Sequence, residues 1–338
     1  MFTVQTIQQV ELMKVTIYDI AKEAKTSPST VSRVLNSSSL ISDDKSRKIL
    51  ETAKKLGYKK RSIKKQRGRA VLSVKLVLGR LKNKKLPLIY SVTDLIQGIK
   101  EGLPDNQVNI ICETTDNPDE LFANKKAGHT DAIIFAFTNV PRKTKLHLDE
   151  TNIPYLVLNR APSGYDFIAF NNEEGMKEVA NAAFSGRKKP VPCFLEMNPK
   201  LEVTIERRKG FMNACEEQGL KKPIVKAIES TDEIDAKLVK DLAKKGVNCL
   251  IGMNDIIASA FMITAMDAGF SIPKDFSLTG FDGSPILSIL PKKIDTISLE
   301  IEDLGHKAGE WINKRVIARE EQKYQIRISG RHIKGDTI

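Results

Sequence analysis

The sequence is poor in the side chains that usually hold metals or cross-link a fold. Only four of its 338 residues are Cys and four are His. The cysteines are widely spaced, with no Cys-x-x-Cys pair and no His nearby, at Cys112, Cys193, Cys215 and Cys249. This spacing argues against a zinc site and against a disulfide framework. We therefore expect four buried free thiols and no bound metal.

Catalytic signatures are also missing. No histidine has a His partner four residues away or a nearby carboxylate of the kind that acid–base sites need. The sequence has no Gly-x-Ser-x-Gly elbow, no Gly-x-Gly-x-x-Gly after its first strand and no Gly-Lys-Ser/Thr loop. These absences predict a protein that is not an enzyme and needs no cofactor.

Long apolar runs are absent as well. No stretch reaches the roughly 20 apolar residues that span a bilayer, and the N-terminal residues mix polar and apolar types unlike a signal peptide. We expect a cytoplasmic protein with no membrane partner. A chain of 338 residues is too long for one compact core and suits a small domain followed by a two-lobed body.

A helix-turn-helix pattern occupies residues 15–36, with the sequence VTIYDIAKEAKTSPSTVSRVLN. Four residues at helical spacing give the first helix an apolar face, namely Ile17, Ile20, Ala21 and Ala24. Ser27 supplies the side-chain oxygen that an N-cap needs, and Pro28 fits the first position of a second helix. The second helix presents short hydroxyls and a guanidinium outward, which suit phosphates and base edges. The residues that we assign to DNA contact here are Thr16, Tyr18, Ser27, Pro28, Ser29, Thr30, Ser32, Arg33 and Asn36.

Two further features favour DNA binding over an ordinary helical hairpin with a solvated basic face. A third apolar stripe follows the acids Asp43 and Asp44 and ends at Gly57, so three helices can close one small core. Residues 14–69 contain 16 Lys and Arg against 5 Asp and Glu, whereas the whole chain carries a net charge of +12. Nearly all the excess positive charge therefore lies in this segment, as expected if it displaces counterions from a duplex.

The segment TIYDIAKEAKTSPSTVSRVLN, with the third helix ending in LGY, resembles the headpiece of the lactose/galactose-repressor family of bacterial transcription factors. The resemblance implies a dimeric repressor with a short hinge helix and a sugar-binding body like that of periplasmic binding proteins. Within the family, the stretches ISDDKSRKILETAKKLGYK and SGYDFIAFN are most similar to the branch that controls β-galactosidase genes. A galactoside effector is the corresponding expectation.

The linker after Tyr58 reads KKRSIKKQRGR and by itself predicts a flexible basic segment. The family places here a hinge helix that inserts a leucine into the minor groove. This sequence departs from that pattern, because Arg67 stands near the expected leucine and Ile63 is the one apolar candidate. We therefore expect phosphate or minor-groove contacts from basic residues instead. These are Lys59, Lys60, Arg61, Lys64 and Arg67.

From residue 71 onward, short β-branched runs alternate with stretches of helical spacing. The runs include LSVKLVL, DAIIFAF, PYLVL, PCFLE, NCLIG and FSLTGF, and helical stretches include residues 172–184, 203–219 and 256–269. This alternation predicts βαβ units and parallel sheets with helices on both faces. We expect a first lobe of about residues 71–170 with 300–325, and a second of about 171–299 with the C-terminal strand. The resembled fold crosses between its lobes three times.

Polar residues at the carboxyl ends of these strands mark the expected ligand site. Each of them has an ordinary structural explanation, since Asn or Asp after a strand often caps a helix, most of all Asp255, and Arg near a helix start often forms a surface ion pair. Together they match the effector pocket that the resemblance implies, in which Arg, Asn and Asp hold sugar hydroxyls. The residues are Tyr90, Asn159, Arg207, Asn254 and Asp282.

The sequence therefore predicts a transcriptional repressor of sugar-utilisation genes, whose partners are an operator duplex, a small sugar effector and a second copy of the chain. Two alternatives keep the same body: a solute-binding transport protein, and a family regulator that responds to a purine. A DNA-processing enzyme is a third, but no nucleophile or metal cluster supports it. Residues 1–13 precede the headpiece without a capping signal, and Met13 is an alternative start.

Overall fold

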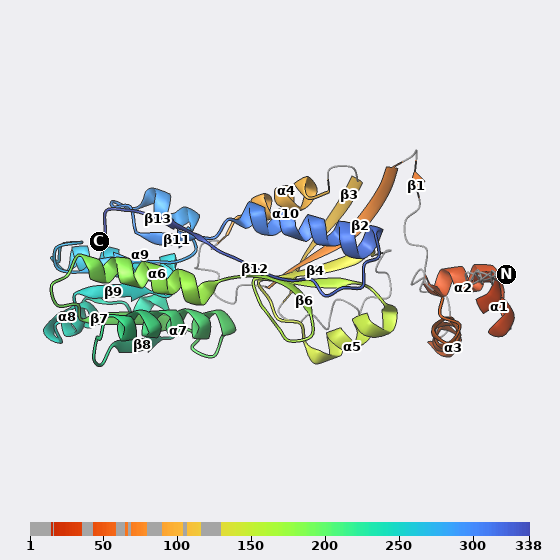
Figure 1. The fold of residues 1–338 in the computed structure, drawn as a ribbon, viewed down its shortest axis with the longest axis horizontal. Helices are drawn as coiled ribbons and strands as arrows, with labels where there is room; N and C mark the ends of the chain where they lie inside the picture. Colours follow the sequence, from red (N-terminus) through yellow and green to blue (C-terminus); the bar gives the residue numbers. More distant parts are fainter. Residues whose placement is uncertain are drawn as a thin grey trace, which may run out of the picture.

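The computed structural model describes residues 15, 17–35, 43–58, 65–66, 69–79, 90–103, 107–115 and 130–338. A helical headpiece lies at one end of the molecule, and two α/β lobes follow along its long axis (Figure 1). This arrangement confirms the predicted fold class, a small helical headpiece and a two-lobed body with parallel sheets.

The headpiece consists of three helices around one small core. They are α1 (Ile17–Glu23), α2 (Pro28–Leu35) and α3 (Asp43–Lys55). Ile20, Val31 and Ile49 are fully or almost fully buried at the centre, as their helical spacing predicts. Lys25 has a φ of 51° in the turn between α1 and α2. The first two helices are therefore held at a sharp angle by a few apolar contacts, with the outer face of α2 turned away from the core.

The first lobe is built on a seven-stranded sheet. Its strands are β1 (Lys65–Gln66), β2 (Arg69–Gly79), β3 (Gln107–Thr115), β4 (Ala132–Ala136), β5 (Tyr155–Leu158), β6 (Asp166–Phe170) and β12 (Gln325–Ile328). All pairs are parallel except that of β1 with β2. The helices are α4 (Val92–Glu101), α5 (Arg142–Thr151) and α10 (Ile301–Ile312). One expectation was wrong here: Cys112 is exposed, because it lies on the edge strand β3, whereas the other three cysteines are buried.

The second lobe has a parallel sheet in the order β10-β9-β7-β8 and a separate pair, β11 with β13. The strands are β7 (Pro192–Met197), β8 (Ile224–Ile228), β9 (Cys249–Gly252), β10 (Ser277–Thr279), β11 (Thr296–Ser298) and β13 (Arg331–Ile333). The helices are α6 (Asn172–Ser185), α7 (Glu202–Glu217), α8 (Ala236–Lys244) and α9 (Asp255–Asp267). Short 3₁₀ turns occupy Thr231–Glu233 and Pro285–Ile289. Right-handed crossovers place α7 on one face of the sheet and α8 with α9 on the other.

The chain passes between the lobes three times, as predicted. It crosses after β6, again between β11 and α10, and finally between β12 and β13. Because β12 pairs with β6, the C-terminal contribution to the first sheet runs to Ile328. Helix α10 continues into a π turn, Asn313–Ile317, where the Ala318 N–H donates to the Asn313 carbonyl. In the described residues, no helix is both long enough and apolar enough to cross a bilayer.

Helices α4 and α10 pack with their backbones in direct contact. Gly98 and Gly102 of α4 face Gly305 and Gly309 of α10. A Cβ atom placed on Gly98 would lie 2.1 Å from the carbonyl oxygen of Glu302, and one on Gly305 would lie 2.4 Å from that of Leu95. Only glycine allows helices to approach so closely. The two helices therefore form one unit on a face of the first sheet.

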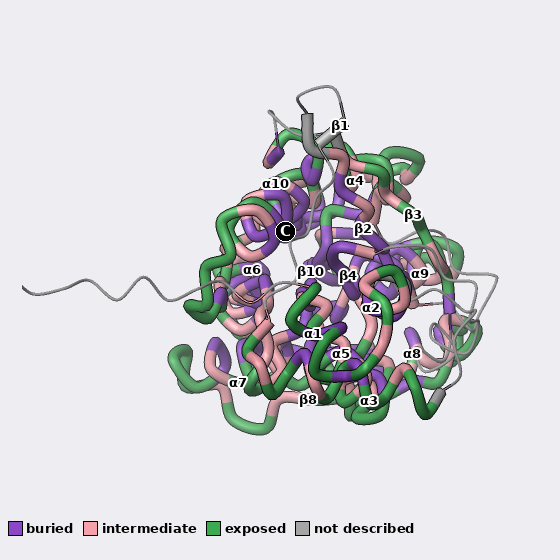
Figure 2. Tube along the Cα trace, turned by 90° about the vertical axis from the view of Figure 1, so that its right-hand side faces the viewer, coloured by how far each residue is buried: buried purple, intermediate pink, exposed green. Residues whose placement is uncertain are grey.

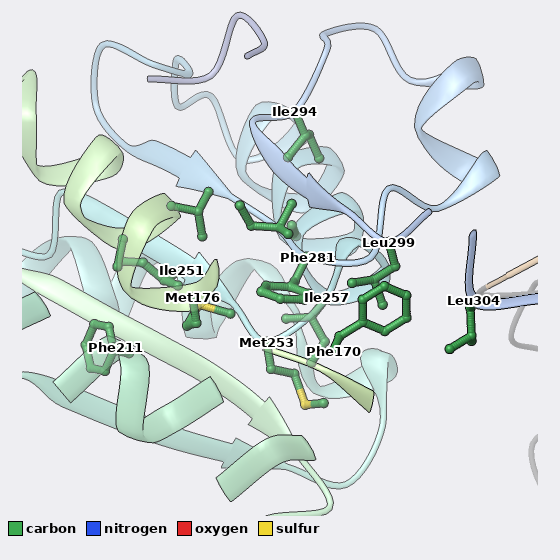
Figure 3. Packing of buried hydrophobic residues seen from close by; sticks show 14 of the residues in the cluster. Phe170, Met176, Phe211, Ile251, Met253, Ile257, Phe281, Ile294, Leu299 and Leu304 are labelled. Carbon is green, nitrogen blue, oxygen red and sulfur yellow. The ribbon is translucent and has the colours of Figure 1, made fainter. Parts of the chain in front are cut away.

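Buried residues fill the space between helices and sheet in each part of the molecule, as the tube view shows (Figure 2). In the second lobe, Phe211, Met176 and Ile251 belong to the same packed cluster as Phe281 and Met253 (Figure 3). Met253 follows β9 directly, and Phe281 comes two residues after the end of β10. The apolar core therefore extends to the edge of the sheet where the predicted ligand residues begin.

Candidate functional site

The outer face of α2 carries a chain of hydroxyl groups at its first turn. Ser27 accepts a hydrogen bond from the backbone N–H of Thr30 at 3.2 Å, so it caps the helix as predicted. Its Oγ also lies 2.8 Å from the hydroxyls of both Ser29 and Thr30. Ser29 is exposed, and Tyr18 on α1 is 68% exposed although it is aromatic. The hydroxyls and Tyr18 are available to a duplex.

Of the other residues assigned to DNA contact, Pro28 is the first residue of α2, as predicted. Most of the others lie outside the described residues, namely Thr16, Asn36, Lys59, Lys60, Arg61, Lys64 and Arg67. The side chains of Ser32 and Arg33 lie outside them too. The backbone of the linker is described at two points, where Lys65–Gln66 pairs antiparallel with Arg69 and Ala70. The proposed contacts of these residues stay predictions.

We expect Ser27→Ala to lower the stability of the headpiece and Ser29→Ala to change its base preference. Ser27→Ala removes the cap of α2 and should lower headpiece stability by about 1 kcal/mol. Ser29→Ala should leave stability within about 0.5 kcal/mol and change which base pairs are preferred. Thermal unfolding measures the change in stability, and selection of duplexes from a random pool measures the change in base preference. An unchanged base preference for Ser29→Ala would remove this residue from the recognition face.

At the junction of the lobes, the Arg207 guanidinium is the centre of a buried polar network. It donates to Asp282 Oδ1 at 2.7 Å, to Asn172 Oδ1 at 3.0 Å and to the Met253 carbonyl at 2.8 Å. Its plane also lies over the Phe281 ring, 4.0 Å from the centroid. Because all these partners come from different elements, Arg207 ties α6, α7 and the ends of β9 and β10 together.

Asn254 and Asp255 divide the roles that the sequence leaves open. Asn254 Oδ1 accepts from the Ile257 N–H at 3.0 Å, so the cap of α9 is Asn254 and not Asp255. Asp255 is fully buried and accepts from the Ser284 N–H and the Thr296 hydroxyl, each at 2.6 Å. Asp282 has a φ of 110°, which only a constrained loop holds. Asp255 thus fixes the loop that carries Asp282 against α9.

Burial raises the pKa of Asp255 well above its usual range, and the nearby charge of Asp282 raises it further. Burial also raises the pKa of Asp282, although Arg207 opposes this shift. The folded state of Asp255 therefore holds its proton more tightly than the unfolded chain, whose Asp pKa is about 3.9.

Relative to an Asp255→Asn variant, the wild type should lose stability as the pH rises. The contribution of Asp255 is complete below the unfolded pKa and disappears as the pH passes through the higher folded pKa. Chemical unfolding of both proteins across a pH series measures the difference. Asp303→Asn, an exposed acid on α10, is the control. A wild type that gained relative stability with rising pH would show that hydrogen bonds from Ser284 and Thr296 outweigh burial.

The first lobe contributes a second buried set. Asn159, at the end of β5, has a φ of 55° and a buried Oδ1 without a hydrogen-bond partner. Arg160 donates to the carbonyls of Asn159 and Phe137, at 2.5 and 3.4 Å, and its buried Nε has no partner. Tyr90 stacks on Phe137 with ring centroids 3.6 Å apart. Burial raises the pKa of Tyr90 to about 12, and Arg160 opposes the shift.

The two sets face each other across the junction. The charge of Arg160 interacts with those of Arg207 and Asp282 on the other side of the junction. Glu202 of α7 accepts from the Ala161 N–H at 3.1 Å, and this bond links the lobes directly. Glu206 accepts from Asn172 at 2.9 Å and pairs with Arg327 at 2.8 Å. The structure therefore brings Tyr90, Asn159, Arg207 and Asp282 to one place, with Asn254 beside them.

Three members of the site were not assigned from the sequence: Arg160, Asn172 and Phe137. Arg160 and Asn172 follow strands β5 and β6, which is the same signal that indicated Asn159. Phe137 follows β4 and has a φ of 59°, an unusual conformation for an aromatic residue that sequence spacing does not reveal.

Comparison with known proteins agrees with this two-part organisation. Residues 16–60 match the model of the lacI family of bacterial regulatory proteins, and residues 174–338 match that of the periplasmic-binding-protein-like domain. The chain is 26% identical to catabolite control protein A of Priestia megaterium, covering 89% of this chain and 92% of that protein. It is 24% identical to the ribose operon repressor of Halalkalibacterium halodurans, covering 93% and 94%.

Solved structures show the same fold. A complex of the transcriptional regulator CelR with cellobiose has a TM-score of 0.68 at 17% identity, covering 96% of this chain and all of that chain. The lac repressor dimer bound to its operator and an anti-inducer has a TM-score of 0.63 at 17% identity, covering 96% and 99%. The headpiece match, the body match and the transcriptional regulators among its near-full-length relatives lead to one conclusion: the chain combines a lacI-family DNA-binding domain with a periplasmic-binding-protein-like domain.

Proposed function

We propose that the chain represses sugar-utilisation genes and that a small sugar, bound between the lobes, relieves the repression. The observation that carries this proposal is the buried polar network around Arg207 and Arg160. Its donors and acceptors are those that vicinal hydroxyls need: two guanidinium groups, Asp282, Asn159 and Asn172. A relative named as a ribose operon repressor, and a related fold with bound cellobiose, support a sugar. A galactoside is the specific candidate.

The orphaned polar atoms indicate where the sugar would bind. A buried polar atom without a partner costs about 1–3 kcal/mol, so the free Asn159 Oδ1 and Arg160 Nε are suited to a ligand hydroxyl. Both atoms belong to the first lobe, whereas Arg207 and Asp282 belong to the second. A ligand that contacts both sets would therefore respond to the angle between the lobes.

Differential binding supplies the switch. A sugar can shift the equilibrium between two lobe arrangements only if it binds one of them better. We propose that the protein acts as a homodimer on a near-palindromic operator, because two-fold symmetry doubles the few base pairs that one α2 reads. A change in lobe angle would then alter the spacing of the paired headpieces. The expected coupling between sugar and operator is about 1–3 kcal/mol.

The proposed domains follow from this mechanism. Residues 14–58 form the headpiece, 59–70 the linker, and 71–338 the effector-binding and dimerisation body, preceded by a 13-residue extension. The proposed location is the cytoplasm, where the operator and a transported sugar meet. Regulators have no catalytic step, and we propose none for this chain.

Asn159→Gly tests the pocket with little risk to the fold. The variant keeps the φ of 55°, which glycine adopts freely, and its lost Oδ1 has no partner in the protein. In a thermal-shift panel of galactosides, other sugars and purines, we expect a sugar to raise the unfolding midpoint of the wild type. The shift should shrink strongly in the variant, because a ligand stabilises only in proportion to its binding. The operator affinity of the variant without ligand should stay within about twofold of the wild-type value, which corresponds to about 0.4 kcal/mol in binding free energy.

The outcome of the panel also decides between the alternatives. Stabilisation by a purine and by no sugar would favour the purine-responsive regulator. An equal shift in wild type and Asn159→Gly would exclude the pocket as proposed. A sugar that binds but leaves operator affinity unchanged would contradict the switch, and would leave a solute-binding role for the body.

A further inference from the structure

A second concentration of basic residues lies at the end of the second lobe that is farthest from the first lobe (Figure 1). In a parallel sheet, all strands begin at the same edge, so the loops that precede β7, β8, β9, β10 and β11 are neighbours there. We call these loops the distal basic face; they are residues 187–191, 219–223, 244–248, 271–276 and 291–294. They contain ten Lys and Arg residues and one carboxylate, that of Asp275.

Three of the five loops of the distal basic face are bonded to one another, namely residues 187–191, 244–248 and 271–276. Asn248 donates to the Lys189 carbonyl at 3.0 Å and accepts from the Val191 N–H at 2.9 Å. Arg187 donates to the carbonyls of Lys274, at 2.8 Å, and Pro273. These bonds use backbone carbonyls and leave the lysine side chains outside. These three loops therefore form one fixed surface, and the pairing of β7 with β8 and the bridge from Thr279 to Asp295 set the other two loops beside it.

Most of these lysines have no ion-pair partner among the residues that the structure describes. Seven of them are exposed and form no ion pair within residues 130–338, which the structure describes without a gap. They are Lys188, Lys189, Lys221, Lys222, Lys245, Lys274 and Lys293. Four helices end at this edge, and a basic residue in a last turn would simply complement the helix dipole. Only α8 has one, Lys244, whereas α6, α7 and α9 have none. Helix capping therefore does not explain the face.

The charge is also not a general property of the body. The net charge of the whole chain is +12, and residues 14–69 account for +11 of it. The body as a whole is close to neutral, so the ten basic residues and one carboxylate of this face are a local excess that acids elsewhere in the body balance. A local excess of unpaired lysines on a fixed surface is the electrostatic feature that polyanions recognise.

The composition of the face selects among polyanions. Its one aromatic residue, Phe276, is buried, so there is no platform for the bases of a single strand. None of the large exposed apolar side chains lies in these loops, so nothing would enter a bilayer. Lysines without aromatic or apolar neighbours suit the phosphates of duplex DNA, which they contact without reading sequence.

We infer that the distal basic face is a second, sequence-independent DNA-binding surface, which holds another stretch of duplex while the headpieces occupy an operator. The two surfaces lie at opposite ends of the molecule, with the first lobe between them (Figure 1). We therefore expect the second duplex to be separate from the operator. The protein would bring two DNA segments together and need no additional subunit to do so.

The test uses the full chain on two duplexes. A duplex that the wild type selects from a random pool is fixed to beads and loaded with protein, and unbound protein is washed away. A fluorescent duplex of about 40 base pairs without the selected site is then added, and the captured fraction is measured against salt. The variant Lys188→Gln/Lys189→Gln/Lys221→Gln/Lys222→Gln removes four charges from the face. The control Lys100→Gln/Lys143→Gln/Lys200→Gln/Lys237→Gln removes four exposed charges elsewhere.

We expect the wild type and the control to capture the second duplex at low salt, with a steep loss as salt rises. The fourfold variant of the face should capture about tenfold less, with its affinity for the first duplex and its thermal midpoint unchanged. Equal capture by this variant would overturn the inference and assign capture to free headpieces. No capture by the wild type at low salt would also overturn it. Retention of phosphatidylserine vesicles in place of the duplex would assign the face to membranes instead.

Discussion

Arg207→Ala should lower the free energy of unfolding of the body by about 3–5 kcal/mol, because it leaves a buried carboxylate without its counter-ion. The side chains of Arg207 and Asp282 are 3% and 8% exposed and meet at 2.7 Å. Truncation would also remove the hydrogen bonds to Asn172 and to the Met253 carbonyl. Urea unfolding of the body measures the loss.

Arg331→Ala is the matched control, since Arg331 forms an ion pair with Glu300 that is 68% and 38% exposed. Its loss should cost no more than about 1 kcal/mol. Adding Asp282→Asn to Arg207→Ala should recover part of the stability by removing the uncompensated charge. If Arg207→Ala unfolds like Arg331→Ala, the pair is solvated and the network is not a buried one. Where Arg207→Ala remains folded, it should bind operator normally and no longer respond to the sugar.

Gly98→Ala should destabilise the first lobe by about 3 kcal/mol, the upper end of the cost of overpacking. The new Cβ would meet the backbone of α10 at Glu302 and His306, which cannot move aside as a side chain could. An ordinary glycine inside a helix behaves in the opposite way, since alanine there usually adds about 0.5–1 kcal/mol. The sign of the effect therefore reports whether α4 and α10 are in backbone contact.

Gly186→Ala provides the comparison for Gly98→Ala. Gly186 ends α6 with a φ of −81°, and a Cβ there would meet nothing within 4 Å. Its replacement should change stability by less than about 1 kcal/mol. Urea unfolding followed by circular dichroism compares the two variants. Stabilisation by both would mean that the helices are farther apart than the structure has them.

Much of the fold could be predicted because periodicity reports burial. The runs DAIIFAF and NCLIG became central strands, and residues 172–184 became α6, since each pattern matches the period of one structure. The π turn after α10 could not be predicted, because a single i to i+5 hydrogen bond leaves no periodic trace. The exposure of Cys112 was missed because it depends on β3 being an edge strand, which is a property of sheet order.

The site was partly predictable for a different reason. Polar residues at the ends of parallel strands meet at one edge, and this rule indicates Asn159, Asn254 and Asp282 from the sequence alone. The rule does not show which of Asn254 and Asp255 caps α9, because both residues follow the strand. The position at which the α9 backbone begins decides this. Arg207 is predicted because it matches a family motif. Its contact with the Phe281 ring could not be predicted, because that contact depends on how the side chains pack.

The three crossings between the lobes have a consequence for how the chain is made. The strand β12 completes the first sheet and β13 pairs with β11 in the second lobe, yet both lie in the last 14 residues of 338. Neither lobe has all its strands until those residues have left the ribosome. While most of the body is being made, the nascent chain therefore exposes two unfinished sheet edges that other chains can bind.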